Sequence, residues 1–312
     1  MSRTDSQSPG YSRVKVYSLL LMGLVCFGFS PILVRFATDV QPMTLAALRT
    51  VFAVLILLPF WYPKRKTLRE LKAGGVNVRL MMLSGFFLGL HLTLFIASLH
   101  YTSVASATIL VTMHPAMMIV AESILFKKRF RSVIWIGVLL ACLGSVLLGY
   151  ADQTQVNAFE NSTLGNTFAF MAAVIFVFYF LIGGKIRKNA EWIDYVFHVY
   201  LHAAIICLVL TFVWVGGWPY LSLTAVLIGL ALAVGPTIIG HGSLNYAVKF
   251  ISPTLLATFV LSEVVIAAIA AYYLFDELPT LLAMIAMAII MAGVILSWTR
   301  KKPATPVSSA DL

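Results

Sequence analysis

The sequence predicts an all-α polytopic membrane protein with ten transmembrane helices, arranged as two inverted five-helix repeats. Three observations support this fold class: the apolar composition, the placement of the charged residues, and an internal repeat. Hydrophobic residues make up 61% of the 312 residues and charged residues 11%, and the mean hydropathy is +0.95. A soluble globular chain carries about 25% charged residues, so this chain lacks the polar surface that faces water.

Apolar runs long enough to cross a bilayer, about 20 residues each, recur along the whole chain. The predicted spans are residues 16–37, 43–62, 78–98, 104–126, 132–150, 163–183, 194–214, 222–241, 254–275 and 279–298. Turn and charge signals separate them, such as WYPKRK after the second span and FKKRFR after the fourth. The first span lacks a small-residue cleavage site and another apolar run follows at once, so we interpret it as a membrane span and not as a signal peptide.

The basic residues predict the orientation of the chain. Apart from Arg35 and Arg49, which lie within or beside spans, every Lys and Arg falls on the same side as the N-terminus. The other side carries acidic residues instead: Asp39, Asp152, Glu160, Asp276 and Glu277. The positive-inside rule then predicts a multi-pass protein of the cytoplasmic (inner) membrane with both termini in the cytoplasm. The net charge of +10 is explained by the anionic cytoplasmic leaflet, without a nucleic-acid partner.

An internal repeat appears when the chain is shifted by 149 residues, because the fourth and fifth spans then align with the ninth and tenth. The shift places Ser103 on Ser252, Ile136 on Ile285, Gly144 on Gly293 and Leu147 on Leu296. Five spans is an odd number, so the second copy enters the membrane from the opposite side. Inverted repeats are typical of alternating-access transporters, whose binding site lies near the midplane between the copies.

The repeat divides the chain into five predicted segments. These are a cytoplasmic N-terminal tail (1–15), the first five-helix repeat (16–150), an external linker (151–162), the second five-helix repeat (163–298) and a cytoplasmic C-terminal tail (299–312).

Several longer motifs are shared with a known family. In the first half they are SPILVRFATDVQPMTLAALRT, SLHYTSVASATILVTMHPAMMIVAESILF and IGVLLACLGSVLL; in the second half they are GHGSLNYAVKFISPTLLATFVLSEVVIAAIAAYYLFDELP and AMAIIMAGVIL. Over residues 16–298 the chain resembles the EamA-type transporters of the drug/metabolite transporter superfamily. The resemblance implies ten helices that carry a small organic solute, such as an amino acid, a nucleoside, a metabolite or a drug, and export is the commoner direction in such families.

The chain keeps some of that family's motif residues and replaces others. Arg49 matches the arginine early in the second helix, and Glu263 matches the acid of a Glu-Pro pair in the ninth, where Val264 replaces the proline. At the outer end of the ninth helix Glu277 matches the acid of a Gly-Glu pair. In the first repeat Pro115 matches the family's motif proline, whereas Lys128 stands where the family usually has an acid.

Glu263 is the main candidate for a functional residue. It lies about 15 Å into its span, at 1.5 Å per residue, and hence near the bilayer centre, where an acid costs roughly 2.5 to 3.5 kcal/mol. The shift of 149 residues places it on His114, at a similar depth in the fourth span. We hypothesise that both line a central cavity, where Glu263 binds a cationic substrate group or a proton. The alternative is a buried carboxylate that only fixes helix packing.

Other polar residues in or beside the spans are further candidates for the substrate or proton site. They are His91 and His241, in the third and eighth spans, together with Tyr101, Asn245, Tyr246 and Arg49. Each histidine could equally satisfy one interhelical hydrogen bond. Arg49 could reach an outer vestibule, or could pair with Asp39 at the external headgroups. Glu122 is interpreted as one partner of an interfacial ion pair with Lys127 or Lys128.

The spacing of histidines, and the glycines and prolines within the spans, bear on a metal site and on hinges. His198 and His202 share one helix face with Asp194, a spacing that could hold a metal, but a polar stripe is the favoured interpretation, so neither a metal nor a cofactor is predicted. Gly28 and Pro31 in the first span, and Gly235 and Pro236 in the eighth, are predicted hinges, because proline frees a backbone carbonyl and permits a bend. The alternative is that Gly and Pro are simply common in membrane helices.

The predicted function is secondary transport of a small organic solute by alternating access, with the bilayer and possible coupling protons as further partners. A passive facilitator or channel-like uniporter is the alternative. A membrane-embedded enzyme is less favoured, since the sequence has no HExxH, GxSxG or phosphate-binding Gly-rich motif.

Overall fold

The computed structural model describes residues 12–37, 39–102, 104–151, 161–275 and 280–298, and all regular structure in these ranges is helical. The first half contains α1 (Arg13–Gly28), α2 (Ser30–Arg35), α3 (Pro42–Trp61), η1 (Tyr62–Lys64), α4 (Leu68–Ala73), α5 (Val78–Tyr101), α6 (Val104–Val111), α7 (His114–Leu125) and α8 (Ser132–Ala151). The second contains α9 (Ser162–Ile186), α10 (Trp192–Val215), α11 (Leu223–Leu232), the π-helix η3 (Ala233–His241), α12 (Gly242–Ala247), α13 (Pro253–Val260), α14 (Glu263–Phe275) and α15 (Leu281–Trp298).

In the described part of the chain, eight helical segments are long and apolar enough to cross a membrane. They are Arg13–Arg35, Pro42–Lys64, Val78–Tyr101, Ser162–Ile186, Trp192–Val215, Leu223–Ala247, Pro253–Leu274 and Leu281–Trp298. Two shorter apolar helices, His114–Leu125 and Ser132–Leu147, lie where the fourth and fifth spans are predicted. The prediction of a polytopic helical membrane protein is therefore confirmed, whereas ten helices in two inverted repeats stays a prediction.

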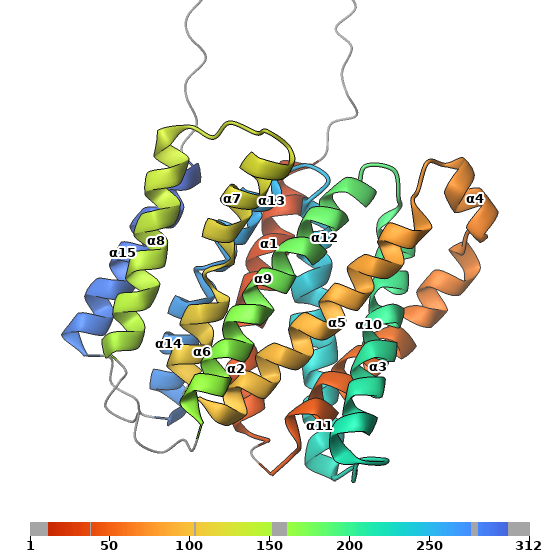
Figure 1. The fold of residues 1–312 in the computed structure, drawn as a ribbon, viewed down its shortest axis with the longest axis horizontal. Coiled ribbons are helices and arrows are strands. Elements are labelled where there is room, and N and C mark those ends of the chain that lie inside the picture. Colours follow the sequence, from red (N-terminus) through yellow and green to blue (C-terminus); the bar gives the residue numbers. More distant parts are fainter. Residues whose placement is uncertain (1–11, 38, 103, 152–160, 276–279, 299–312) are drawn as a thin grey trace, which may run out of the picture.

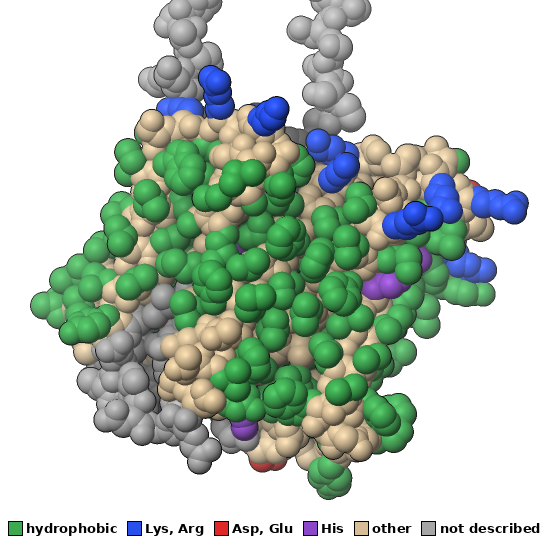
Figure 2. Space-filling model, in the orientation of Figure 1, with side chains coloured by type: hydrophobic (Ala, Val, Ile, Leu, Met, Phe, Trp, Pro, Cys, Tyr) green, Lys and Arg blue, Asp and Glu red, His purple; other side chains and the backbone are tan. Residues whose placement is uncertain are grey.

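The helices stand side by side in one bundle (Figure 1). Helix α5 packs against α9 and α10, α3 packs against α10, and α1 packs against η3, α12 and α14. Helices α8 and α15 form a pair at one edge. Most of the visible surface is hydrophobic, and Lys and Arg side chains gather along its upper edge in Figure 2. We call the end of the bundle that holds α4 and the turn at residues 126–131 the Lys/Arg-rich face.

Several helices are interrupted within their spans, and proline explains most of these interruptions. Pro31 lies at the start of α2 and Pro115 at the start of α7, and Pro236 lies inside the π-helix. Proline cannot donate a backbone hydrogen bond, so the regular α-helical pattern is broken at these positions. The break between α13 and α14 has no proline; there the Ser262 N–H donates to the Phe259 carbonyl over 3.1 Å, which tightens the backbone into an i to i+3 turn.

Glycine allows α8 and α15 to approach each other at backbone distance. A Cβ atom added to Gly293 would lie 2.5 Å from both the Ala141 nitrogen and the Gly137 oxygen, and one added to Gly144 would lie 2.9 Å from the Ile290 nitrogen. These neighbours are backbone atoms, which cannot rotate away as a side chain can. The pair therefore requires glycine at these positions.

Substitution of Gly293 by alanine is expected to push α8 and α15 apart and lower the free energy of unfolding by about 1–3 kcal/mol, the usual cost of overpacking. Thermal unfolding in detergent would measure this change. Gly217→Ala is the matched control, because an added Cβ there meets nothing within 4 Å. Equal melting temperatures for Gly293→Ala and the wild type would contradict the stabilising role of this contact.

Candidate functional site

A cavity lies within the bundle, between the two halves of the chain. It encloses about 670 Å³ of empty space, including the solvent at its mouth. Its polar lining comes from seven helices and consists of Ser30, Arg49, His91, Thr108, His114, His241 and Glu263. Its apolar lining includes Phe27, Phe95, Val111, Phe176, Leu244, Val260, Val264 and Ala267. The cavity therefore brings together five of the predicted binding residues, which are Glu263, His114, His91, His241 and Arg49.

Glu263 is the first residue of α14, immediately after the break that follows α13. Its side chain is partly exposed and lines the cavity, and no hydrogen bond or ion pair to its carboxylate is present among the described residues. A Cβ on Gly28 would lie 2.5 Å from Ile266 and 3.2 Å from the Glu263 carbonyl oxygen. Glycine at position 28 thus lets α1 approach α14 beside the acid. Because it has no partner among the described side chains, the Glu263 carboxyl group is available to a ligand.

His114 is likewise the first residue of its helix, α7, and its side chain replaces a backbone hydrogen bond that is lost at the break. In a regular helix the residue-115 N–H would donate to the Val111 carbonyl, but Pro115 has no such donor. The His114 Nδ1 atom lies 2.7 Å from that carbonyl oxygen. Because a carbonyl only accepts, Nδ1 carries the hydrogen. His114 therefore has a structural role as well as a place in the cavity wall.

His91 and His241 meet around a phenylalanine that the sequence analysis did not single out. The His91 and His241 ring centres are 6.3 Å apart, and the Phe176 ring centre lies 5.2 Å from His91 and 4.5 Å from His114. His91 also donates from Nδ1 to the Ala172 carbonyl over 2.9 Å. His91 therefore lines the cavity and also makes an interhelical hydrogen bond, so the two roles expected as alternatives occur together.

Arg49 is buried, with 2% of its surface exposed. Its Nε donates to Thr237 Oγ1 over 3.0 Å, and the Thr237 hydroxyl donates in turn to the Leu232 carbonyl. The Tyr200 hydroxyl donates to the Thr237 carbonyl over 2.8 Å, so the π-helix that carries Thr237 is itself held in place. The guanidinium lines the cavity and forms no ion pair among the described residues; Asp39, the partner considered from the sequence, is exposed.

The other predicted binding residues lie away from the cavity wall. The Tyr101 ring contacts His100 and Phe168 near the end of α5. Asn245 is fully buried, where it accepts from the Tyr179 hydroxyl over 2.9 Å. Tyr246 lies beneath the Lys15 ammonium, which is 5.4 Å from its ring centre.

The four predicted hinge residues divide between two places. Gly28 and Pro31 line the cavity at the break between α1 and α2. Gly235 and Pro236 lie in the π-helix and are absent from the cavity lining. Pro236 thus widens the helix at this point, and hinge motion at all four positions stays a prediction.

His198 and His202 do not form a metal site with their neighbours. His202 Nδ1 lies 2.6 Å from the His198 carbonyl of its own helix, and the His198 ring packs edge-on against Trp61. No group of three or more His, Cys, Asp or Glu side chains that could hold a metal occurs in the described part of the chain.

The cavity can therefore bind a ligand by charge and by hydrogen bonding. It presents one guanidinium, three imidazoles and one carboxylate, and the two charged groups of opposite sign are not neutralised by other described side chains. A buried unpaired charge is costly, so such groups usually have a partner. A solute in the cavity would supply it.

The sequence is similar to that of known transporters. The EamA-like transporter family matches residues 14–150 and again residues 163–299. An uncharacterized transporter of Archaeoglobus fulgidus is 26% identical over 287 residues, which cover 91% of this chain and 94% of that protein. The uncharacterized transporter YdfC of Bacillus subtilis is 24% identical over 275 residues, covering 83% and 82% of the two chains.

A solved crystal structure shares the fold, with a TM-score of 0.74 and 17% sequence identity over 92% of this chain and 97% of the other. The family matches both halves of the sequence. The two relatives, which this chain matches over most of their length, are both named as transporters. The protein therefore belongs to the EamA-like transporter family and is a multi-pass membrane transporter of the drug/metabolite transporter type.

Proposed function

We propose that the protein carries a small organic solute across the cytoplasmic membrane by alternating access, with the cavity as the solute site and the Lys/Arg-rich face toward the cytoplasm. Export is the proposed direction, from the likeness to the family. The observation that carries the proposal is the presence of Arg49 and Glu263, without counterions among the described residues, in the wall of one intramembrane cavity. Such unpaired intramembrane charges mark solute and proton pathways.

The inverted repeat is part of this proposal, and the positions of the helix breaks support it. Helix α6 ends at Val111 and α7 begins at His114, while α13 ends at Val260 and α14 begins at Glu263. Each pair of positions is separated by the same 149 residues that the sequence repeat predicts. Interrupted helices at equivalent positions of two halves are typical of transporters whose site lies between the halves.

The chemistry of Arg49 and Glu263 indicates which groups the solute carries. A guanidinium binds carboxylate or phosphate through its planar fork of donors, and the free terminal nitrogens of Arg49 are the available donors, because its Nε is occupied by Thr237. Glu263 then binds a cationic or hydrogen-bond-donating group, or a proton. The substrate is accordingly an organic molecule with an acidic group, whose remaining surface contacts Phe27, Phe95 and Phe176.

Glu263→Gln is expected to reduce solute flux by about tenfold or more, because loss of a desolvated charge contact costs several kcal/mol. Purified protein in proteoliposomes would be supplied with pooled amino acids and small metabolites, with and without an inward proton gradient. His198→Gln is the matched control, since His198 is also intramembrane but does not line the cavity. Gradient-independent flux that survives Glu263→Gln would make the protein a passive facilitator and Glu263 a packing residue.

Arg49→Gln is expected to remove the preference for an acidic group. For wild-type protein, free carboxylates should inhibit the flux of the identified solute about tenfold more strongly than their matching amides, as for hydrogen bonds to charged groups. In Arg49→Gln the acid and the amide should inhibit equally, while Arg49→Lys should keep part of the difference. Equal inhibition by acids and amides in the wild type would leave Arg49 with a purely structural role.

A further inference from the structure

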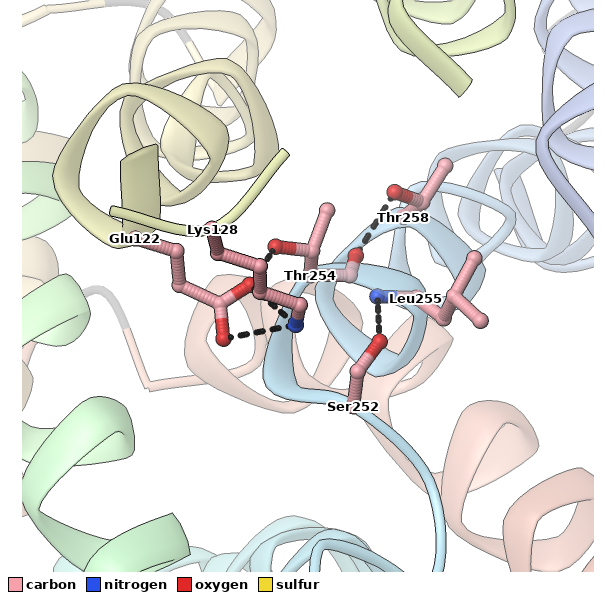
Figure 3. A network of polar contacts seen from close by, with 6 residues as sticks. All are labelled: Glu122, Lys128, Ser252, Thr254, Leu255 and Thr258. Carbon is pink, nitrogen blue, oxygen red and sulfur yellow. Dashed lines mark hydrogen bonds and ion pairs between the residues drawn. The ribbon is translucent and has the colours of Figure 1, made fainter. Parts of the chain in front are cut away.

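A buried polar network joins α7 to α13 at their Lys/Arg-rich ends (Figure 3). Glu122, on the last turns of α7, has only 5% of its side chain exposed. Its carboxylate accepts from Lys128 Nζ over 3.0 and 3.1 Å and from Thr254 Oγ1 over 2.5 Å. Thr254 is fully buried and comes from the other half of the chain. Glu122, expected from sequence to form only an interfacial ion pair, therefore also links the two halves.

The Lys128 side of this network is set by the way α7 ends. The Phe126 and Lys128 N–H groups both donate to the Glu122 carbonyl, over 3.1 and 3.3 Å. Between them Lys127 adopts a φ of 49°, in the left-handed region that residues other than glycine rarely occupy. The turn folds the chain back and places the Lys128 ammonium on the carboxylate of its own helix. The ion pair thus belongs to α7 alone and does not depend on α13.

The Thr254 side is set by the start of α13. Ser252 caps the helix through the Leu255 N–H, and Pro253 is its first residue. The Thr258 hydroxyl, one turn further along, donates to the Thr254 carbonyl within the same helix over 2.8 Å. The Thr254 hydroxyl instead leaves its own helix and donates to Glu122. The two threonines are equally buried, but only the Thr254 hydroxyl donates a hydrogen bond to the other half of the chain.

The same two helices reach the cavity with their other ends. His114 at the start of α7 and Val260 at the end of α13 both line it. Thr254 lies six residues before Val260 on the same helix, or about 9 Å nearer the Lys/Arg-rich face at 1.5 Å per residue. A helical segment moves as a rigid unit, and each of these segments ends at a break. Separation of α7 from α13 at Thr254 would therefore open the cavity toward that face.

We propose that Glu122, Lys128 and Thr254 form a latch that closes the cavity on its Lys/Arg-rich side, and that the Glu122–Thr254 hydrogen bond breaks whenever that side opens. The inference rests on the proposed alternating-access function. During opening Glu122 keeps its ion pair with Lys128, so no charge is left unpaired. Opening therefore breaks one hydrogen bond to Glu122 and leaves its charge paired.

A sided labelling experiment tests the latch without knowledge of the solute. Val260→Cys provides a reporter in the cavity wall, and labelling of the native cysteines, none of which lines the cavity, is subtracted with protein that lacks the reporter. A membrane-impermeant maleimide is applied to vesicles from one side or the other. Thr254→Val is expected to raise the labelling rate from the Lys/Arg-rich side about tenfold, the population shift for loss of one hydrogen bond to a charged group, and to lower it from the opposite side.

Two control variants isolate the hydrogen bond. Thr254→Ser keeps the hydroxyl and should label like the wild type. Thr258→Val removes a hydroxyl of equal burial that bonds only its own helix, and it should also label like the wild type. Identical sided labelling of Thr254→Val, Thr258→Val and the wild type would overturn the latch, as would an equal increase in both valine variants.

A cross-link tests the opposite direction and covers the case in which Thr254→Val fails to fold. Glu122→Cys/Thr254→Cys is joined by a short bis-methanethiosulfonate reagent, and Glu122→Cys alone, treated in the same way, corrects for reagent that reacts with the reporter itself. Labelling of the reporter from the Lys/Arg-rich side should be lower in the double variant than in this control, and the difference should disappear on reduction. Labelling that persists in the cross-linked protein would overturn the latch. Solute flux is measured in the same vesicles: sided labelling that responds as expected while flux is absent from every variant and from the wild type would retain the latch and reject the transport proposal.

Discussion

The need to satisfy every backbone hydrogen bond inside an apolar bundle governs the position of the site. A membrane helix can break only where other groups replace the lost bonds or where a cavity admits water. At Pro115 the replacement is the His114 imidazole, which donates to the Val111 carbonyl. At the matching break in the second half the backbone tightens into a shorter turn, and Glu263 begins the next helix. The breaks thus create the helix termini at which His114 and Glu263 stand.

Much of the site could be predicted because a charge in an apolar run is a strong signal. Glu263, His114 and Arg49 are conspicuous in the sequence for that reason, and the structure gathers them around one cavity. Tyr101 and Tyr246 carry a weaker signal, because a tyrosine near a helix end also serves an interface, and both lie outside the cavity lining. Asn245 is buried as its position indicates, but its partner is Tyr179.

The remaining features depend on tertiary packing, which leaves no local pattern. Phe176 is one apolar aromatic residue among many in its helix, yet it touches three imidazoles. Pro236 indicates an irregular helix but not the π-helix that offers Thr237 to Arg49. The Glu122–Thr254 bond joins residues 132 positions apart, and a threonine in an apolar helix most often bonds its own backbone, as Thr258 does.

Two of the contacts between the halves of the bundle differ in how readily they part. Hydroxyl and carboxylate groups join α7 to α13, whereas glycine brings the α8 and α15 backbones together at the edge of the bundle. The outer sides of α8 and α15 carry exposed apolar residues, such as Leu143 and Ile295, that face the surrounding acyl chains. If the halves rock as proposed, this pair would act as a pivot whose outer side is apolar and exposed. Bilayer thickness and lateral pressure then act on the pivot itself, so the turnover of the carrier becomes sensitive to the lipids around it.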